Sequence, residues 1–217
     1  MTDNRRLGHN VSYSERRNFA WYRVAKNGTR SLHRLLEDEV DDYVYLTRRN
    51  GMTTELSRLL SSDCETFTIV RNPWDRLLSA WRQKFTNNRE RRERWEKLLR
   101  LDVSPELART AATDFSVFVR TLPDSELFRS NAHCMTQTAV LDGANIAVTG
   151  RFERYDEEVR ALLGRIGLRH AGREIPHRNR SSGGDHYSVH YTDETREIVG
   201  ELYRDDLEQW GFTFESG

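Results

Sequence analysis

The chain is poor in cysteine and has no long apolar run. Only Cys64 and Cys134 are present among 217 residues, and neither stands in a C-x-x-C or metal-ligand spacing. We therefore expect two reduced, partly buried thiols and neither a disulfide framework nor a metal site. No apolar stretch approaches the ~18 residues that a membrane-spanning helix needs, so no membrane span is predicted.

The N-terminal residues lack the apolar segment of a secretory signal peptide. Residues 1–7 are Met-Thr-Asp-Asn-Arg-Arg-Leu, which carry charge where such a peptide is hydrophobic. The expected location is therefore the cytoplasm. With 36% hydrophobic residues, the chain is large enough to bury a substantial core, and a single domain over residues 1–217 is predicted.

Net charge and lysine are also scarce. The 34 basic and 34 acidic residues cancel, which argues against a general nucleic-acid-binding surface. Only Lys26, Lys84 and Lys97 are lysines, and the other 31 basic residues are arginines. In a chain that otherwise favours arginine, Lys26 is a candidate functional residue. Lysine is a compact point charge that can release a proton, which arginine does poorly.

What the chain does contain is an alternation of strand and helix patterns. Strands are predicted at 18–25, 43–46, 66–70 and 146–149, and helices at 30–40, 52–60, 74–86, 90–100, 104–121, 155–167 and 192–209. Alternation of this kind implies parallel pairing. We therefore predict an α/β fold with a central, mainly parallel sheet and helices on both faces.

The first predicted strand leads into a glycine turn with basic and hydroxyl groups. The sequence from residue 23 to 33 is Arg-Val-Ala-Lys-Asn-Gly-Thr-Arg-Ser-Leu-His. Backbone N–H groups, hydroxyls and cations at such a helix N-terminus converge on an anion, because unpaired donors and the helix dipole favour negative charge. The stretch is typical of a loop that holds phosphate or sulfate.

A second basic segment follows the third predicted strand. Pro73 suits the first turn of a helix and places Arg71 at the carboxyl end of the preceding strand. Ligands bind at that edge in open α/β sheets. Ser79 lies two turns further on and would add a hydroxyl to an anion held by Arg71. Alternatively, Arg71 forms a surface salt bridge and Ser79 is a neutral helix residue.

Taken together, these segments resemble the sulfotransferases that use 3′-phosphoadenosine 5′-phosphosulfate (PAPS), particularly the carbohydrate sulfotransferase branch. The family loop Pro-Lys-x-Gly-x-x-Ser stands here as residues 25–31, with Ala25 in place of proline, and the family's 3′-phosphate motif stands as residues 71–79. Residues 131–137, 150–153 and 199–212 also resemble segments of the branch, so the likeness spans about 18–213. The ATP-type GxxxxGK[ST] loop is absent, since Lys26 precedes the glycine.

The resemblance implies a P-loop-like three-layer fold, PAPS as sulfuryl donor, PAP (the desulfated product) and no metal. It implies that Lys26 contacts the leaving oxygen, that the rest of the loop binds the 5′-phosphate and that the second segment binds the 3′-phosphate. The implied cofactor-binding residues are Lys26, Asn27, Gly28, Thr29, Arg30, Ser31, Arg71 and Ser79, with Arg178 and Ser181 from a late polar loop. A solvated loop explains Arg178 and Ser181 nearly as well.

The acceptor hydroxyl needs a general base, and the resemblance favours His133. Histidine accepts a proton near neutral pH, and His133 lies in the family-like segment 131–137. The alternative is a histidine that merely orders that segment. Glu55 is the second candidate, because related enzymes place a carboxylate or histidine after the second strand. His33 is expected to pack on the first helix.

Two classes of function remain open at this point. The first is a PAPS-dependent O-sulfotransferase acting on a hydroxyl of a glycan, glycolipid or other small acceptor, with no nucleic-acid partner. The second is a non-catalytic nucleotide- or anion-binding domain on the same fold. A phosphotransferase is disfavoured by the order of residues in the loop. The sequence sets neither the acceptor nor the oligomeric state.

Overall fold

The chain divides into two compact units. The computed structural model describes residues 10–47, 50–86, 89–168, 175 and 185–216. Unit 1 comprises residues 1–70 and 140–182, and unit 2 comprises residues 71–139 and 183–217. The single domain over residues 1–217 stays a prediction.

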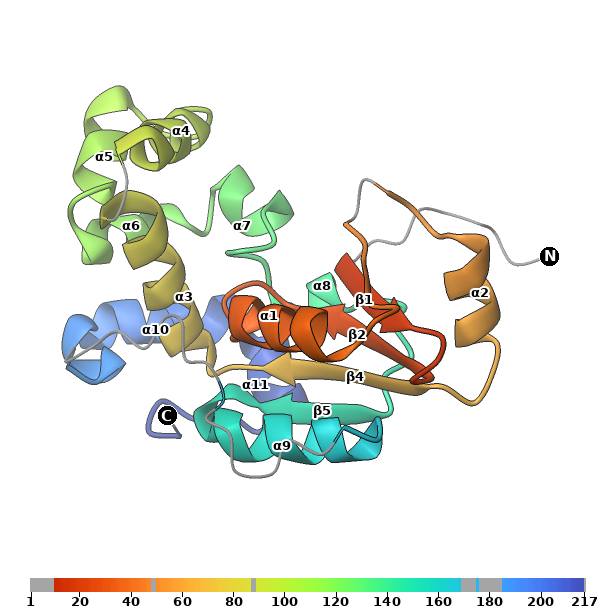
Figure 1. The fold of residues 1–217 in the computed structure, drawn as a ribbon. Helices are drawn as coiled ribbons and strands as arrows, with labels where there is room; N and C mark the ends of the chain where they lie inside the picture. The colour runs from red at the N-terminus through yellow and green to blue at the C-terminus, as the bar shows by residue number, and fades with distance from the viewer. Residues whose placement is uncertain (1–9, 48–49, 87–88, 169–174, 176–184, 217) are drawn as a thin grey trace. The chain divides into compact units, whose positions relative to one another are not determined.

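Unit 1 contains the sheet (Figure 1). Its elements are β1 (Asn10–Ser14), β2 (Phe19–Arg23), α1 (Thr29–Glu39), β3 (Val44–Tyr45), α2 (Thr54–Leu60), β4 (Glu65–Val70), β5 (Val148–Arg151), a 3-10 turn (Phe152–Arg154) and α9 (Tyr155–Arg165). The described strands lie in the order β3-β1-β2-β4-β5. β2, β4 and β5 pair in parallel, whereas β1 is antiparallel to both neighbours. All but β1 therefore run in one direction, which confirms the mainly parallel sheet.

Strand β1 was missed by the sequence prediction. Its residues alternate Val11 and Tyr13 with polar positions, of which Ser12 and Ser14 are also fully buried. Burial is possible because polar partners exist, as in the 2.6 Å hydrogen bond from Ser14 Oγ to Asp42. A tight hairpin returns the chain to β2 through Asn18, whose φ of 53° suits asparagine. β1 thus separates β3 from β2, which strand-helix alternation alone would have made neighbours.

Helices cover both faces of this sheet, as predicted. The core of unit 1 joins Trp21 and Phe67, which point to one face, to leucines of α1 and α9. α2 contacts β2 and lies toward the other face, where the Tyr13 hydroxyl is 3.2 Å from Thr53 Oγ1. Helices on both sides of a mainly parallel sheet give unit 1 the three layers expected of a P-loop-like fold (Figure 1).

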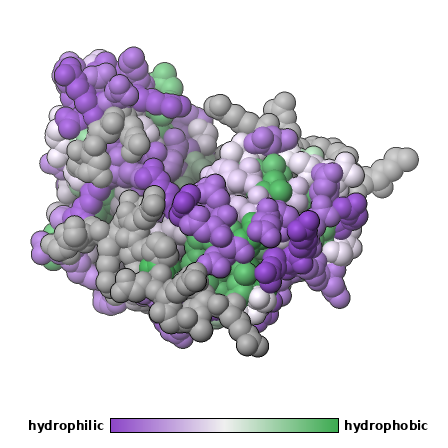
Figure 2. Space-filling view, viewed as in Figure 1, coloured by the Kyte–Doolittle hydropathy of each residue, from purple (hydrophilic) through white to green (hydrophobic). Residues whose placement is uncertain are grey.

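Unit 2 is helical. Its elements are α3 (Pro73–Trp81), a π-helix (Arg82–Thr86), α4 (Arg89–Leu99), α5 (Pro105–Ala111), α6 (Phe115–Thr121), α7 (Glu126–Ser130), α8 (Gln137–Val140, on which the division falls), a 3-10 turn (Tyr187–His190), α10 (Asp193–Leu202) and α11 (Arg204–Trp210). The surface over α4 is mostly hydrophilic (Figure 2), because α4 contains many charged residues. In the part of the chain that is described, no helix has the length and apolarity to cross a bilayer.

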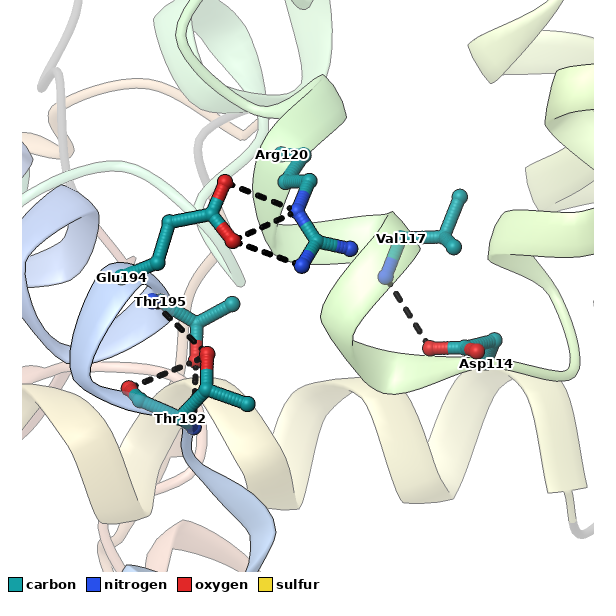
Figure 3. A network of polar contacts seen from close by, with 6 residues as sticks. All are labelled: Asp114, Val117, Arg120, Thr192, Glu194 and Thr195. Atoms are coloured by element: carbon teal, nitrogen blue, oxygen red, sulfur yellow. Dashed lines mark hydrogen bonds and ion pairs between the residues drawn. The ribbon is translucent and has the colours of Figure 1, made fainter.

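Two helices predicted as continuous are broken in unit 2. The predicted helix 104–121 is wrong because Asp114 caps a new helix: its Oδ1 accepts a 3.0 Å hydrogen bond from the Val117 N–H (Figure 3). The predicted helix 192–209 is interrupted at Tyr203, whose buried hydroxyl donates to the Cys134 carbonyl. In both places a capping or tertiary hydrogen bond overrides helical periodicity.

A fork of hydrogen bonds joins α6 to the start of α10 (Figure 3). Arg120 Nε and Nη2 donate to the Glu194 carboxylate at 2.6–3.1 Å. Next to it, Thr192 and Thr195 form a reciprocal capping box. Because Arg120 and Glu194 are both exposed, solvent screens the pair, and it contributes little to stability.

The two thiols are expected to differ in reactivity. Cys134 is fully buried, and burial raises its pKa to about 12, while Cys64 is half-buried with its pKa raised by burial as well. Only the thiolate reacts. At about pH 8 we expect a disulfide reagent such as DTNB to modify Cys64 slowly and Cys134 only after denaturation, as read by mass spectrometry. Modification of both thiols in the folded protein at similar rates would contradict the burial of Cys134.

Candidate active site

The loop between β2 and α1 has a backbone that is unusual for an L-residue. Lys26 has a φ of 78° and Gly28 a φ of 73°. A left-handed conformation at a non-glycine residue costs about 1–2 kcal/mol and is found mostly where function requires it. Residues in such turns direct successive N–H groups into one concavity, which is suited to an anion. The backbone of residues 26–28 is therefore compatible with an anion loop, and anion binding by it stays a prediction.

Some of the backbone donors at the start of α1 make no hydrogen bond to the described residues. The N–H groups of Ser31 and Leu32 bond to the Gly28 carbonyl at 3.0 and 3.2 Å. Those of Gly28, Thr29 and Arg30 make no hydrogen bond among the described residues. α1 is 11 residues long, so its dipole adds positive potential at the same point. Three unpaired donors at a helix N-terminus form the feature that binds phosphate groups in other proteins.

Two side chains of the loop hold it in place. Asn27 is buried, and its Nδ2 donates a 2.7 Å hydrogen bond to the carbonyl of Ile69 in β4. The Thr29 hydroxyl donates to the Val24 carbonyl at 2.8 Å. Arg30 is exposed and Ser31 is buried. These contacts show how the loop is anchored, and nucleotide contacts by the same residues stay predictions.

Sequence reasoning missed Tyr155, which supports the loop from α9. Its hydroxyl donates a 2.8 Å hydrogen bond to the Gly28 carbonyl. Burial raises the pKa of Tyr155, and hydrogen bonds from the Leu32 backbone and the Ser31 side chain partly oppose that rise. Tyr155 is therefore a neutral phenol at physiological pH. Its position two residues after the family-like segment 150–153 was the available signal.

The Arg71 segment begins unit 2, directly after the last residue of β4. The guanidinium of Arg71 pairs with Asp75, one helical turn on, through Nε at 2.8 Å and Nη2 at 2.7 Å to the same carboxylate oxygen. The side chain retains 12% of its surface exposed. Pro73 begins α3, and the Asn72 side chain caps it by accepting from the Trp74 N–H. The predicted strand end and helix start are confirmed.

Ser79 lies on the same face of α3 as Asp75. The two are four residues apart, and both are partly exposed while their neighbours on the helix are largely buried. Among the described residues the Ser79 hydroxyl makes no hydrogen bond. Since Arg71 reaches Asp75, the structure brings Arg71 and Ser79 to one side of α3. Phosphate binding by the pair stays a prediction.

His133 lies in a segment that is fixed by a buried arginine. Arg76 is fully buried and donates to the carbonyls of Ala132 and Met135 at 2.8 Å each. The His133 ring packs edge-on against Trp95, with ring centroids 5.9 Å apart. Packing of this kind orients an imidazole, and it suits an ordering role as well as a positioned base. The assignment of His133 as base stays a prediction.

The second candidate base, Glu55, is placed in the first turn of α2. It is exposed, and hydrogen bonds from its own backbone N–H and from Thr53 lower its pKa. A lower pKa makes a carboxylate a weaker base, so this environment disfavours Glu55. His33 packs between Tyr43 and Tyr45, with ring centroids at 5.6 and 4.4 Å.

The predicted site residues fall into three groups. Residues 26–31 form the loop before α1 and the first turn of that helix in unit 1, whereas Arg71, Ser79 and His133 belong to unit 2. Arg178 and Ser181 lie outside the described residues. Within the ranges that are described, no group of three or more His, Cys, Asp or Glu side chains is placed to hold a metal ion.

Comparison with known families agrees with this geometry. A profile described as the sulfotransferase family matches residues 9–213. The chain therefore belongs to the sulfotransferase family, and its likeness to the carbohydrate-type branch is consistent with that membership. No curated protein and no solved structure matches the chain. Family membership makes the protein a transferase of sulfuryl groups in general terms.

Proposed function

We propose that the protein is a PAPS-dependent O-sulfotransferase that sulfates a hydroxyl of a glycan, glycolipid or other small acceptor. The observation that carries the proposal is that three N–H groups, those of Gly28, Thr29 and Arg30, have no partner among the described residues and follow the left-handed Lys26. Such donors suit the 5′-phosphate of a nucleotide. The lysine of this loop, Lys26, adds a positive charge before the glycine, whereas an ATP-type loop places its lysine after the glycine turn.

In the proposed reaction the sulfuryl group passes directly from donor to acceptor. The acceptor oxygen attacks sulfur as its proton passes to a general base, for which His133 is the candidate. The bond between sulfur and the bridging oxygen of the phosphosulfate breaks, and PAP leaves with that electron pair. As in phosphoryl transfer, catalysis rests on alignment and on neutralising charge. Lys26 donates a hydrogen bond to the bridging oxygen as negative charge develops there.

Arg71 and Ser79 are proposed to recognise the 3′-phosphate. Arginine has five N–H donors, of which Asp75 engages two. A charge-assisted hydrogen bond to the 3′-phosphate is lost entirely when a nucleotide lacks that phosphate. The site would therefore discriminate strongly against nucleotides without a 3′-phosphate. The preformed pair with Asp75 keeps the guanidinium ordered before nucleotide binds, which reduces the entropy lost on binding.

The proposal predicts that PAP binds more tightly than AMP, which differs only in lacking the 3′-phosphate. Ligand that binds the native state raises the melting temperature by mass action. We expect a larger shift with PAP than with equimolar AMP, and loss of that difference in Arg71→Ala. Equal shifts with both nucleotides in the wild-type protein would contradict the assignment of Arg71.

Catalysis itself is tested by transfer of labelled sulfate from PAPS to a panel of glycan, glycolipid and phenol acceptors. Incorporation that depends on protein and acceptor is the expected result. If PAP binds selectively but no acceptor is labelled, the proposed enzyme activity is overturned in favour of a non-catalytic nucleotide-binding domain.

A further inference from the structure

Gln137 holds the backbone of Arg71 by two hydrogen bonds. Its Oε1 accepts from the Arg71 N–H at 3.0 Å, and its Nε2 donates to the Arg71 carbonyl at 2.8 Å. The amide thus pairs with both backbone groups of one residue, as a neighbouring strand would. Gln137 is fully buried at the start of α8. Arg71 is therefore fixed through its backbone by Gln137 and through its guanidinium by Asp75.

The buried carboxylate of Asp206 in α11 determines which way the Gln137 amide points. Asp206 Oδ2 accepts from the backbone N–H of Gln137 at 2.8 Å and from its Nε2 at 3.2 Å. Its Oδ1 accepts from the backbone N–H and the hydroxyl of Thr138 at 2.9 and 3.0 Å. A carboxylate only accepts, so the NH₂ of Gln137 must face it and Oε1 must face the Arg71 N–H.

Burial of such a carboxylate lowers the stability of the folded protein unless its hydrogen bonds offset the desolvation. Asp206 is fully buried and forms no ion pair among the described residues, so only neutral donors offset its desolvation. An apolar side chain packed between α8 and α11 would avoid that cost. It would not set the orientation of the Gln137 amide. Nothing would then keep Gln137 Oε1, the acceptor, facing the Arg71 N–H.

We propose that Asp206 is a positioning residue for 3′-phosphate recognition, acting through Gln137 on Arg71. The inference rests on the proposed function, because it assumes that Arg71 binds that phosphate. It assigns Asp206 no contact with the nucleotide. Loss of the carboxylate would let the amide reorient and the Arg71 backbone move, and the affinity for the 3′-phosphate would fall while the rest of the nucleotide is held as before.

The test compares the dissociation constants of PAP and AMP for the full chain. Each carboxylate oxygen of Asp206 accepts two hydrogen bonds. In Asp206→Asn an NH₂ group replaces one of these oxygens and cannot accept, so two of the four hydrogen bonds are lost. We expect PAP to bind at least about tenfold more weakly and AMP to change by less than about twofold, so that the PAP/AMP preference falls. Asp205→Asn is the matched control, since Asp205 is the adjacent residue, is exposed and gives the same change in charge. It should keep the wild-type preference.

A second variant addresses the case in which Asp206→Asn does not fold. Gln137→Met keeps the length of the side chain and removes its bonds to Arg71, while Asp206 retains three of its donors. The same selective loss of PAP affinity is expected. A purely structural role would lower the melting temperature and weaken PAP and AMP equally, which would overturn the inference.

The outcomes for the wild type and the variants separate the two proposals. If the wild-type protein does not prefer PAP over AMP, the proposed function fails and the role of Asp206 fails with it. If the wild type prefers PAP and both Asp206→Asn and Gln137→Met keep that preference, only the role of Asp206 is overturned.

Discussion

Lys26→Ala is expected to reduce the rate of sulfuryl transfer by at least ~10²–10³-fold, the usual effect of removing a group that stabilises charge in a transition state. The loss should fall on kcat, because the charge that Lys26 neutralises develops only as the S–O bond breaks. PAP binding should weaken far less, since the backbone donors of residues 28–30 do not depend on the lysine side chain. Transfer of labelled sulfate and titration with PAP measure the two effects.

The fold of Lys26→Ala should be unchanged. Alanine at a φ of 78° carries the same conformational penalty as lysine, so the free energy of unfolding should shift by less than about 0.5 kcal/mol. Lys97→Ala, at an exposed position of α4, is the matched control and should keep full activity. Retention of kcat within about tenfold of wild type in Lys26→Ala would remove Lys26 from the mechanism.

Much of the fold was predictable because its core elements are locally consistent. The strand ending at Arg23 and the strand ending at Val70 are rich in β-branched and aromatic residues, and Pro73 marks a helix start. The failures have two physical causes. β1 and the break at Tyr203 depend on polar side chains whose partners, Asp42 and Cys134, lie far away in the chain, and no local pattern reveals such a partner. The break at Asp114 depends on a local cap, because the partner is the Val117 N–H three residues on, and helical periodicity alone does not register a cap.

The candidate site divides in the same way. The loop with Lys26 and Gly28 was recognisable because its turn, cations and hydroxyls are adjacent in sequence. Tyr155, by contrast, is 127 residues from Gly28 and Asp206 is 69 residues from Gln137. Residues that support a site through a buried hydrogen bond do not take part in the reaction themselves, and no sequence motif identifies them. They become visible only when the fold brings them to the loop or the strand end.

Gly28→Ala is expected to destabilise the protein by roughly 2–5 kcal/mol, the sum of a left-handed backbone penalty and overpacking. A Cβ at this position would overlap Tyr155 Cε2 and lie 2.6 Å from Cζ. To admit it, the Tyr155 ring must move and the hydroxyl must leave the Gly28 carbonyl. For a chain of this size the melting temperature should fall by roughly 5–15 °C, and PAP binding should weaken as the start of α1 shifts.

Gly143→Ala separates the two contributions, because Gly143 has a φ of 75° and nothing within 4 Å of its added Cβ. It should lose only the backbone share, about 1–2 kcal/mol. In Gly28→Ala/Tyr155→Leu, the leucine removes the ring that the new methyl group meets, so the two changes together should cost less than their sum. Strict additivity in this cycle, or equal losses at positions 28 and 143, would show that Tyr155 does not press against the loop.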